Sequence, residues 1–455
     1  MLSRIKTLKD VVDWGLCTGC GACYYACARG GISLVNVESV GIRPRFETAE
    51  CAACTACLAI CPGYQVDARP APEPGSVCPR PLGARSNELD GARDNPEPGS
   101  VCPRPLGGEG HRVRGSAEAS KADREFGHAL EIWEGYAADP EIRHYASSGG
   151  ILSALALYCL EKEGMEFVLH SAMDEAKPWA NRTVQSRTRS EILACTGSRY
   201  SPASPCDGLR AIEESDGPCV FIGKPCDVAA VNSLRSARPA LNRHLGLVLT
   251  FFCAGTPSSR GTLNLIESLG VSPQDEIRSV RYRGEGWPGR FKVVSGDSGE
   301  EKSLSYMDSW GRLAHDRPLR CHLCPDGLGQ VADISCGDAW EKFENNGDSG
   351  RSIVLVRTER GRAILHRAIA ANYVELKPVS SQAVLAAQPN LLSRRRELFG
   401  RLLAMRLLRI PIPRFRGFSL FQSWKRLPRR KEVQTILGTV RRIVFRGMWR
   451  RRPVF

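Results

Sequence analysis

Residues 17–27 read CTGCGACYYAC, and residues 51–61 read CAACTACLAIC. Each stretch spaces four cysteines as C-x2-C-x2-C-x3-C, the ligand pattern of chains that carry two [4Fe–4S] clusters. In such chains the first three cysteines of one run share a cluster with the fourth cysteine of the other run. We therefore predict one cluster on Cys17, Cys20, Cys23 and Cys61, and a second on Cys51, Cys54, Cys57 and Cys27. This pattern predicts an electron carrier or a redox enzyme.

Small residues separate these cysteines and let backbone N–H groups point at the sulfur atoms. They are Gly19, Gly21, Ala22, Ala52, Ala53 and Ala56. Pro62 follows the last cysteine as the pattern expects, whereas Ala28 stands after Cys27 where proline is usual. A zinc site normally uses two separate C-x2-C pairs and not four cysteines in one continuous run. Disulfides are not expected in a cytosolic chain. The iron–sulfur interpretation is therefore favoured over both.

The chain has 455 residues, 42% of them hydrophobic, which is enough for about two to four domains with buried cores. No long apolar stretch precedes the first cysteine, so we expect no secretory or twin-arginine leader. The longest apolar runs, Ile151 to Leu160 and Leu245 to Cys253, are about half the roughly 20 residues that span a bilayer. We expect a cytoplasmic protein.

The net charge of +14 is concentrated at one end of the chain. From Ser393 to Phe455 there are 19 Lys and Arg against Glu397 and Glu432, so the remaining residues are slightly acidic. Arginines alternate there with Leu, Ile, Phe and Trp, a mixture that suits the headgroup region of an anionic membrane. We therefore expect that the protein can associate peripherally with the inner face of the membrane. A helical extension that docks a partner is the alternative. RNA binding is disfavoured because no recognition module accompanies the charge, and we expect no nucleic acid partner.

A twelve-residue repeat, PEPGSVCPRPLG, occurs at Pro72 to Gly83 and again at Pro96 to Gly107. It is rich in Pro and Gly and lacks hydrophobic periodicity, which is typical of a linker. Cys78 and Cys102 each stand alone between Val and Pro, so we assign them no function. We expect poor order in this linker and in the basic tail.

From about Phe126 the chain alternates helix-like and strand-like patterns. ILSALALYCLEKEG predicts a helix that a preceding serine caps, and strands are predicted in MEFVLHSAM, at Cys219 to Ile222 and in LGLVLTFFCAG. Such alternation predicts an α/β body whose chemistry lies in loops at the strand ends. The stretch IRSVRYRGEGWPGRFKVVSG instead favours antiparallel strands.

Four further cysteines stand in loop contexts, at IGKPCD, FFCAGTP and RCHLCPD. With SSGG, RYRGEGWPG, ADISCGDAW and SIVLVRTERG, these segments resemble, in order and spacing, the beta subunit family of coenzyme F-420 hydrogenase and dehydrogenase, over about residues 126–390. The resemblance implies a third [4Fe–4S] cluster on Cys226, Cys253, Cys321 and Cys324, and bound FAD. Cys336 matches no required cysteine of the family, and Cys159, Cys195, Cys206 and Cys219 are interpreted as core or surface thiols.

A flavin needs backbone N–H groups for its pyrophosphate, and cations or amides near its ring. Ser147, Ser148, Gly149 and Gly150 precede a predicted helix and meet the first need, although an ordinary helix cap remains an alternative. Gly223 and Lys224, beside Cys226, meet the second need. Gly197, Ser198 and Tyr200 match another family segment near the flavin, and Gly337 and Asp338 adjoin the expected cluster loop.

These observations lead to an iron–sulfur flavoprotein oxidoreductase in which FAD and the clusters pass electrons between coenzyme F-420, or a similar hydride donor or acceptor, and a redox partner or ferredoxin. The alternatives are a non-catalytic electron-transfer subunit, and a ferredoxin-dependent reductase of a membrane-linked or envelope-linked substrate. No catalytic acid or base is assigned, because hydride transfer depends mainly on ring alignment. The expected organisation is a ferredoxin-like domain (1–70), a linker (71–125), the two family-like domains (126–235 and 236–390) and a basic amphipathic tail (391–455).

Overall fold

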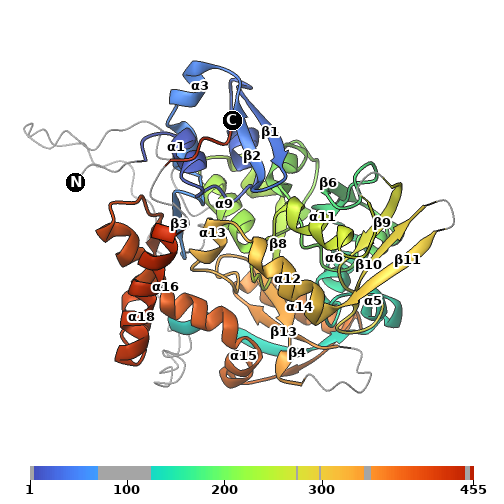
Figure 1. The fold of residues 1–455 in the computed structure, drawn as a ribbon. Coiled ribbons are helices and arrows are strands. Elements are labelled where there is room, and N and C mark those ends of the chain that lie inside the picture. Colours follow the sequence, from blue (N-terminus) through green and yellow to red (C-terminus); the bar gives the residue numbers. More distant parts are fainter. Residues whose placement is uncertain (1–4, 70–123, 273–274, 297–298, 343–349, 446–450) are drawn as a thin grey trace, which may run out of the picture.

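The computed structural model describes residues 5–69, 124–272, 275–296, 299–342, 350–445 and 451–455 (Figure 1). The duplicated linker, with Cys78 and Cys102, lies outside these residues. The described chain is a mixed α/β structure with a small cysteine-rich module on one side.

A mixed sheet of eight strands forms the centre, in the order β14-β4-β13-β12-β8-β7-β5-β6. The strands are β4 (Glu131–Ala137), β5 (Val168–Met173), β6 (Asn181–Ser186), β7 (Cys219–Gly223), β8 (Leu245–Phe251), β12 (Ile334–Asp338), β13 (Ser352–Val356) and β14 (Val374–Pro378). Neighbours within β5-β7-β8-β12 are parallel, and the outer pairs are antiparallel. Because β4 pairs with both β13 and β14, the two family-like segments share one sheet.

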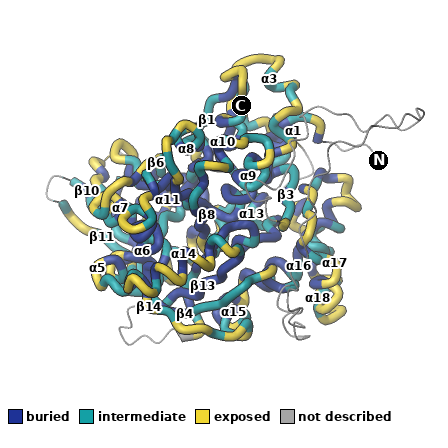
Figure 2. The backbone as a smooth tube through the Cα atoms, turned by 180° about the vertical axis from the view of Figure 1, so that it is seen from behind, coloured by how far each residue is buried: buried dark blue, intermediate teal, exposed yellow. Residues whose placement is uncertain are grey.

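Helices cover both faces of this sheet, which explains why β8, with the sequence LGLVLTF, is apolar almost throughout. On one face lie α6 (Ile151–Glu161) and α14 (Glu359–Ala370). On the other lie α8 (Leu209–Glu213), α9 (Pro225–Arg235) and α10 (Pro239–His244). Figure 2 shows the strands in the middle buried and the exposed positions gathered on outer elements such as α3 and α18.

A three-stranded antiparallel sheet stands beside the central one, as the stretch after Ile277 predicts. It is formed by β9 (Ile277–Arg281), β10 (Arg290–Ser295) and β11 (Glu300–Ser305). It packs on α11 (Ser259–Glu267) and α12 (Tyr306–Leu313) through a core that includes Tyr282 and Phe291. The remaining short elements of the body are α5 (Pro140–Tyr145), α7 (Arg189–Ala194), α13 (Leu319–His322), η2 (Pro205–Gly208), η3 (Ala314–Asp316) and η4 (Trp340–Lys342).

The N-terminal module packs directly against this body. It contains α1 (Leu8–Asp13), α2 (Ala22–Ala26), β1 (Ile32–Val37), β2 (Gly41–Phe46), α3 (Ala49–Ala53), η1 (Ala56–Leu58) and β3 (Gln65–Asp67). Gly21 lies at the contact: its φ is +86°, and a Cβ there would come within 2.8 Å of the Ser204 carbonyl oxygen. Only glycine allows both the left-handed backbone and this close approach.

The basic C-terminal segment is folded, so the expectation of poor order is wrong for its described residues. It forms α15 (Ser381–Ala387), α16 (Pro389–Leu407), β15 (Arg414–Arg416), α17 (Leu420–Trp424) and α18 (Arg429–Phe445). Leu398, Leu402 and Met405 pack with Leu8 and Val11 of α1 in one apolar core, which gives the segment the buried surface that orders it.

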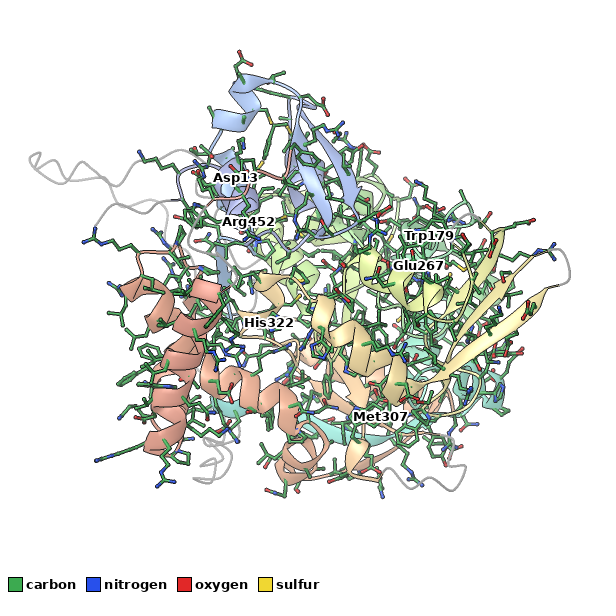
Figure 3. All side chains as sticks on the ribbon, viewed as in Figure 1. Asp13, Trp179, Glu267, Met307, His322 and Arg452 are labelled. Atoms are coloured by element: carbon green, nitrogen blue, oxygen red, sulfur yellow. The ribbon has the colours of Figure 1, made fainter. Side chains whose placement is uncertain are left out.

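Backbone hydrogen bonds also link this segment to the N-terminal module. β15 pairs with β3 in parallel, and the Arg452 backbone N–H donates to the Asp13 carbonyl oxygen at 3.0 Å, two residues that Figure 3 labels side by side. Among the described residues, none of the helices combines the length and the apolar character that crossing a bilayer requires.

Candidate functional site

The first predicted set of cysteines comes together in the N-terminal module. Burial raises the pKa of the Cys23 thiol well above its usual value, and the nearby sulfur atoms of Cys20, Cys17, Cys61 and, least of the four, Cys57 raise it further. The fourth cysteine of the second run therefore lies with the first three cysteines of the first run. The crossed ligation of the two clusters stays a prediction from the spacing.

The second set is grouped in the complementary way. Burial raises the pKa of Cys57 to about 12, and the neighbouring Cys27, Cys54 and Cys51 add to the shift. These four thiols lie nearer the surface than the first set, because all four are only half-buried, whereas Cys17, Cys20 and Cys61 are buried. Iron binding would oppose these pKa shifts, since a cation stabilises the thiolate.

The third set assembles from three loops of the body. Burial raises the pKa of Cys253 to about 12, with Cys321 and Cys324 adding to the shift, and Cys226 interacts with Cys253 and Cys324. Cys226 lies in the first turn of α9, Cys253 follows β8, and Cys321 lies on α13. In the described chain, no three His, Cys, Asp or Glu side chains converge as they would on one metal ion. In a four-iron cube, by contrast, the thiolates bond to different irons.

A small cavity, with about 640 Å³ of empty space that includes open solvent, joins the third set to the first set. Cys226, Cys253, Cys321 and Cys324 all line it, and so does Cys17 of the N-terminal module. Arg320, between these elements, donates one N–H to the Pro62 carbonyl oxygen at 2.9 Å and another to the Leu323 carbonyl oxygen at 3.0 Å. The hydrogen bond to Pro62 links the body directly to the end of the second cysteine run of the module.

A larger cavity, with about 1480 Å³ of empty space that includes open solvent, lies on the other side of the third set. The expected flavin residues Ser147, Ser148, Gly150, Gly223 and Lys224 line it, as do Gly197, Ser198 and Tyr200. Gly149 is not part of the lining. Its N–H donates to Ser352 Oγ at 2.9 Å, and a Cβ there would come within 2.5 Å of the Gly135 carbonyl oxygen.

The SSGG loop does not provide the serine cap that the sequence predicts. The N-cap of α6 is Gly150, with φ of +79° and no side-chain hydrogen bond. The serine hydroxyls are used elsewhere: Ser147 Oγ accepts from the Ser198 backbone N–H, and Ser148 Oγ pairs with Ser352 Oγ at 2.8 Å. The first residues of α6 line the cavity and the N-cap provides no side-chain acceptor, so this helix N-terminus has N–H groups available for an anion.

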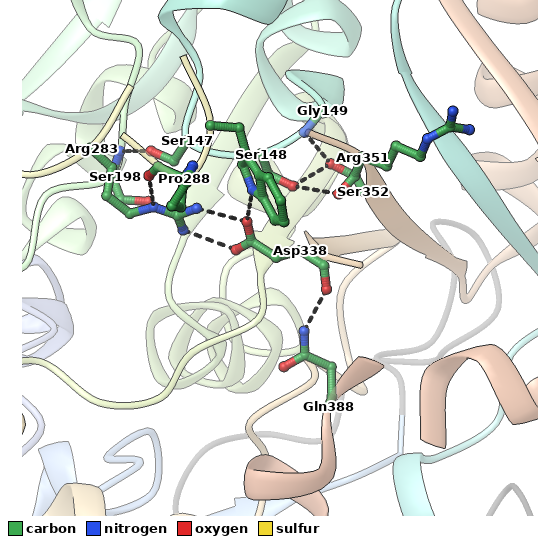
Figure 4. A network of polar contacts seen from close by, with 11 residues as sticks. Ser147, Ser148, Gly149, Ser198, Arg283, Pro288, Asp338, Arg351, Ser352 and Gln388 are labelled. Atoms are coloured by element: carbon green, nitrogen blue, oxygen red, sulfur yellow. Dashed lines mark hydrogen bonds and ion pairs between the residues drawn. The ribbon is translucent and has the colours of Figure 1, made fainter. Parts of the chain in front are cut away.

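Hydrogen bonds between β12 and the loop after β9 form a polar network in the wall of the larger cavity (Figure 4). Arg283 is 2% exposed and donates two N–H groups to the Asp338 carboxylate, at 2.8 and 3.0 Å. Trp287 Nε1 donates to the same carboxylate at 2.8 Å, and Gln388 Nε2 donates to the Asp338 carbonyl oxygen at 2.7 Å. Asp338 is thus held in the wall of the larger cavity, where sequence reasoning had placed it beside the cluster loop.

Lys224 and Asp227 form a buried ion pair at the start of α9. Lys224 Nζ lies 2.7 Å from Asp227 Oδ2, and their side chains are 8% and 0% exposed. Burial acts to lower the pKa of Lys224, but Asp227 and Cys226 outweigh it, so the pKa is raised. Lys224 therefore carries a fixed positive charge between the two cavities, because it lines both.

Two further titratable groups beside the larger cavity are neutral at pH 7. Burial lowers the pKa of His170 to about 4, and its Nε2 pairs with Ser186 Oγ at 2.8 Å. Burial raises the pKa of the Cys336 thiol, which lines the larger cavity but not the smaller one.

Sequence reasoning missed the arginines around the smaller cavity, Arg43, Arg320 and Arg394. Arg394 stands in an RRR run that looks like surface charge, and nothing local marks any of the three as buried.

Comparison with known proteins gives three matching family models. Residues 132–209 match the model of the coenzyme F-420 hydrogenase/dehydrogenase beta subunit, N-term, and residues 218–382 match the model of the C terminus of that subunit. Residues 16–64 match a 4Fe-4S dicluster domain. These segments contain all twelve cysteines of the three predicted sets.

Relatives agree with these models. The coenzyme F-420 hydrogenase subunit beta of Methanococcus voltae is 27% identical over 259 residues, 56% of this chain and 86% of that protein. The F420-dependent formate dehydrogenase subunit beta of Methanocaldococcus jannaschii is 25% identical over 249 residues, 54% of this chain and 62% of that protein.

A chain of the F420-reducing [NiFe] hydrogenase complex of Methanosarcina barkeri matches with a TM-score of 0.47 and 22% identity, over 60% of this chain and 94% of that one, a likeness too weak to carry an argument. The two subunit models together match more than half of the residues. The chain therefore belongs to the coenzyme F-420 hydrogenase/dehydrogenase beta subunit family of oxidoreductases and carries a 4Fe–4S dicluster module near its N-terminus.

Proposed function

We propose that the chain is an iron–sulfur flavoprotein that transfers electrons between a hydride donor or acceptor and its N-terminal clusters. One observation carries the proposal: the third cysteine set lies between the larger cavity and the first set. Ala203, Lys224, Cys253, Gly255 and Thr256 line both cavities, and Cys17 lines the smaller one. The order of sites would then be the larger cavity, the third set, the first set and the second set.

The larger cavity fits FAD in its chemistry. The α6 N-terminus offers N–H groups to a pyrophosphate, and Lys224 offers a positive charge on the side of the third set. Bound FAD would supply the step between a two-electron hydride and single electrons. The cavity walls would exclude water, and Ser147, Ser148 and Asp338 would keep their own hydrogen bonds without moving.

The three cysteine sets fit [4Fe–4S] clusters. Each set has four thiols in one place, and the cavity at the contact between module and body is lined by the third set and by Cys17 of the first set. The clusters would carry one electron at a time. The half-buried second set then forms the end of the route at which a redox partner or ferredoxin can approach.

Coenzyme F-420 is the hydride carrier that we propose, on the ground that the named relatives belong to F-420-dependent enzymes. The competing function is a subunit that only conducts electrons between partners. The two functions differ in one property, because hydride chemistry requires a flavin and one-electron conduction does not.

The test is to purify the chain anaerobically and to quantify flavin and iron, alongside a Gly149→Val variant. We expect one FAD and about twelve irons per parent chain, since each of three cubes holds four. In Gly149→Val the side chain would collide with the Gly135 carbonyl oxygen and displace the SSGG loop. We expect this variant to lose the flavin and keep its iron, because the loop touches no cysteine set.

Gly311→Ala is the matched control, since nothing lies within 4 Å of a Cβ added to this α12 residue. It should keep both cofactors. Twelve irons without flavin in the parent would favour the electron-conducting subunit. Flavin retained by Gly149→Val would contradict the placement of FAD at the SSGG loop.

We propose a second role for α18, contact with an anionic membrane surface. The helix buries Thr435, Thr439 and Ile443, whereas Val433, Leu437 and Val444 are exposed by 53, 62 and 54%. These three residues recur at nearly the spacing of one helix face, beside the exposed Arg430 and Arg441. An apolar stripe beside basic residues suits the headgroup layer of an anionic membrane, where each cation adds about 1 kcal/mol to the free energy of binding.

Leu437→Glu should reduce co-sedimentation of the full chain with phosphatidylserine-containing vesicles at least tenfold, because it removes an inserting side chain and adds a repelled one. Gln434→Glu adds the same charge at an exposed position off the stripe and should lose less. Equal binding of both variants, or binding of the parent to neutral vesicles alone, would contradict this role.

A further inference from the structure

Buried arginines surround the cavity that joins the third cysteine set to the N-terminal module. Arg394 of α16 and Arg320 of α13 both line it, and they are 9% and 3% exposed. α16 begins at Pro389, outside the segments that match any of the three family models. This helix is therefore an element of this chain that the family match does not assign.

Arg394 forms hydrogen bonds to the loop that carries Cys253. Its Nη2 donates to the Cys253 carbonyl oxygen and its Nη1 to the Ala254 carbonyl oxygen, both at 2.8 Å. The guanidinium packs closely against Gly327, because a Cβ added to this glycine would come within 2.6 Å of Nη2. The Arg394 side chain therefore has one defined position beside a cysteine of the third set.

The N–H at Nε of Arg394, one of the five N–H groups of the side chain, is buried and finds no acceptor in the described residues. Arg320 repeats this arrangement: two N–H groups reach carbonyl oxygens, and Nε is buried and unpaired. A buried donor without a partner costs about 1–3 kcal/mol, and a buried charge without a counter-charge costs more. Within the described chain neither guanidinium forms an ion pair; the Asp326 carboxylate, which also lines the cavity, accepts from the Gln330 backbone N–H at Oδ2, and its Oδ1 is buried without a partner in the described residues.

A [4Fe–4S] cluster is the group that would satisfy both arginines. Its sulfides and four cysteine thiolates make it anionic and present several acceptors, and each added electron makes it more negative. Positive charge and hydrogen bonds to its sulfur atoms raise the reduction potential of such a cluster, because they stabilise the reduced form.

We propose that Arg394 sets the reduction potential of the third cluster, by donating its Nε–H to cluster or cysteine sulfur and by placing its charge there. The proposal rests on the third cluster of the proposed function. It gives the basic C-terminal segment a role inside the protein: α16 makes the third cluster easier to reduce, so that it accepts electrons from the larger cavity.

The experiment compares full-length Arg394→Gln and Arg394→Lys with the parent, by iron quantification and by a redox titration followed by electron paramagnetic resonance. A Cys253→Ser variant identifies the signal of the third cluster. In Arg394→Gln we expect the one-electron equilibrium of the third cluster to shift at least tenfold toward the oxidised form, which lowers its reduction potential by about 59 mV. Arg394→Lys keeps the charge but not the planar donor, so it should shift less, and the N-terminal clusters should not change.

Arg396→Gln is the matched control on the same helix, because Arg396 pairs with Glu125 at 2.8 Å and does not line the cavity. It should leave all potentials as they are. An unchanged potential in a fully loaded Arg394→Gln chain, or the loss of four irons from both Arg394 variants, would overturn the proposal. If Arg394→Gln alone loses iron, the test depends on Arg394→Lys. A lowered reduction potential of the third cluster in Arg394→Lys would then support the proposal, and an unchanged potential would overturn it. Eight irons in the parent would instead overturn the third cluster itself.

Discussion

Replacing Cys226 and Cys253 together with serine is expected to lower the iron content from about twelve to about eight atoms per chain, the loss of one cube. Both thiols lie with Cys321 and Cys324 around one cavity, so the remaining two cysteines cannot hold four irons. The N-terminal sets lie in a separate module and should stay loaded. The measurement is chemical iron and sulfide analysis after anaerobic purification.

Cys219→Ser is the control for this experiment. Its single S–H has two acceptors within reach, Ser215 Oγ and the Gly217 carbonyl oxygen, so a hydroxyl can take its place, and Cys219 belongs to none of the three sets. It should keep about twelve irons, like the parent. Twelve irons in the double variant, or eight in the parent, would contradict a cluster at the third set.

Removing the positive charge of Lys224 should strongly destabilise the body. In Lys224→Met the Asp227 carboxylate stays fully buried, without the ammonium that now lies 2.7 Å away. Breaking a buried pair in this way costs about 3–5 kcal/mol. For a body of this size we expect the melting temperature to fall by roughly 10 °C, measured by circular dichroism on anaerobic, iron-loaded protein.

Lys224→Met combined with Asp227→Asn should recover most of this loss. The asparagine is neutral, and its side-chain oxygen can still accept from the backbone N–H of residue 224, which now donates to Asp227 Oδ2 at 2.9 Å. A single Lys224→Met chain that melts with the parent would show that the ion pair contributes nothing to stability. A double variant that melts below the single one would show that Asp227 has a role beyond charge balance.

The two runs of N-terminal cysteines could be recognised from the sequence because ligand spacing within each run is a local property, whereas the crossed assignment of Cys27 and Cys61 stays a prediction. The strands around Cys219 and Leu245 and the helix after Gly150 were also predicted, since continuous apolar runs bounded by glycine and proline are local signals. The third set required the family resemblance, because its loops come together only in the folded sheet.

Other features could not be predicted from local sequence. The SSGG serines lie just before a helix and are good caps by type, but Ser352 and the Ser198 backbone compete for their hydroxyls. Arg394 belongs to a run that resembles solvated charge, and only tertiary packing places it against Cys253. The same packing orders the C-terminal segment, whose composition had indicated poor order.

The parallel pairing of β3 with β15 has a consequence for how the protein is made. Gln65 meets Arg414, a residue synthesised 349 positions later. At about 5–20 residues per second, the ribosome needs roughly 20 to 70 seconds to cover that distance. During this interval the cysteine module has emerged without its strand partner or the α16 side of its core. Iron delivery during synthesis would therefore meet an open module, whereas delivery after release would meet a closed one.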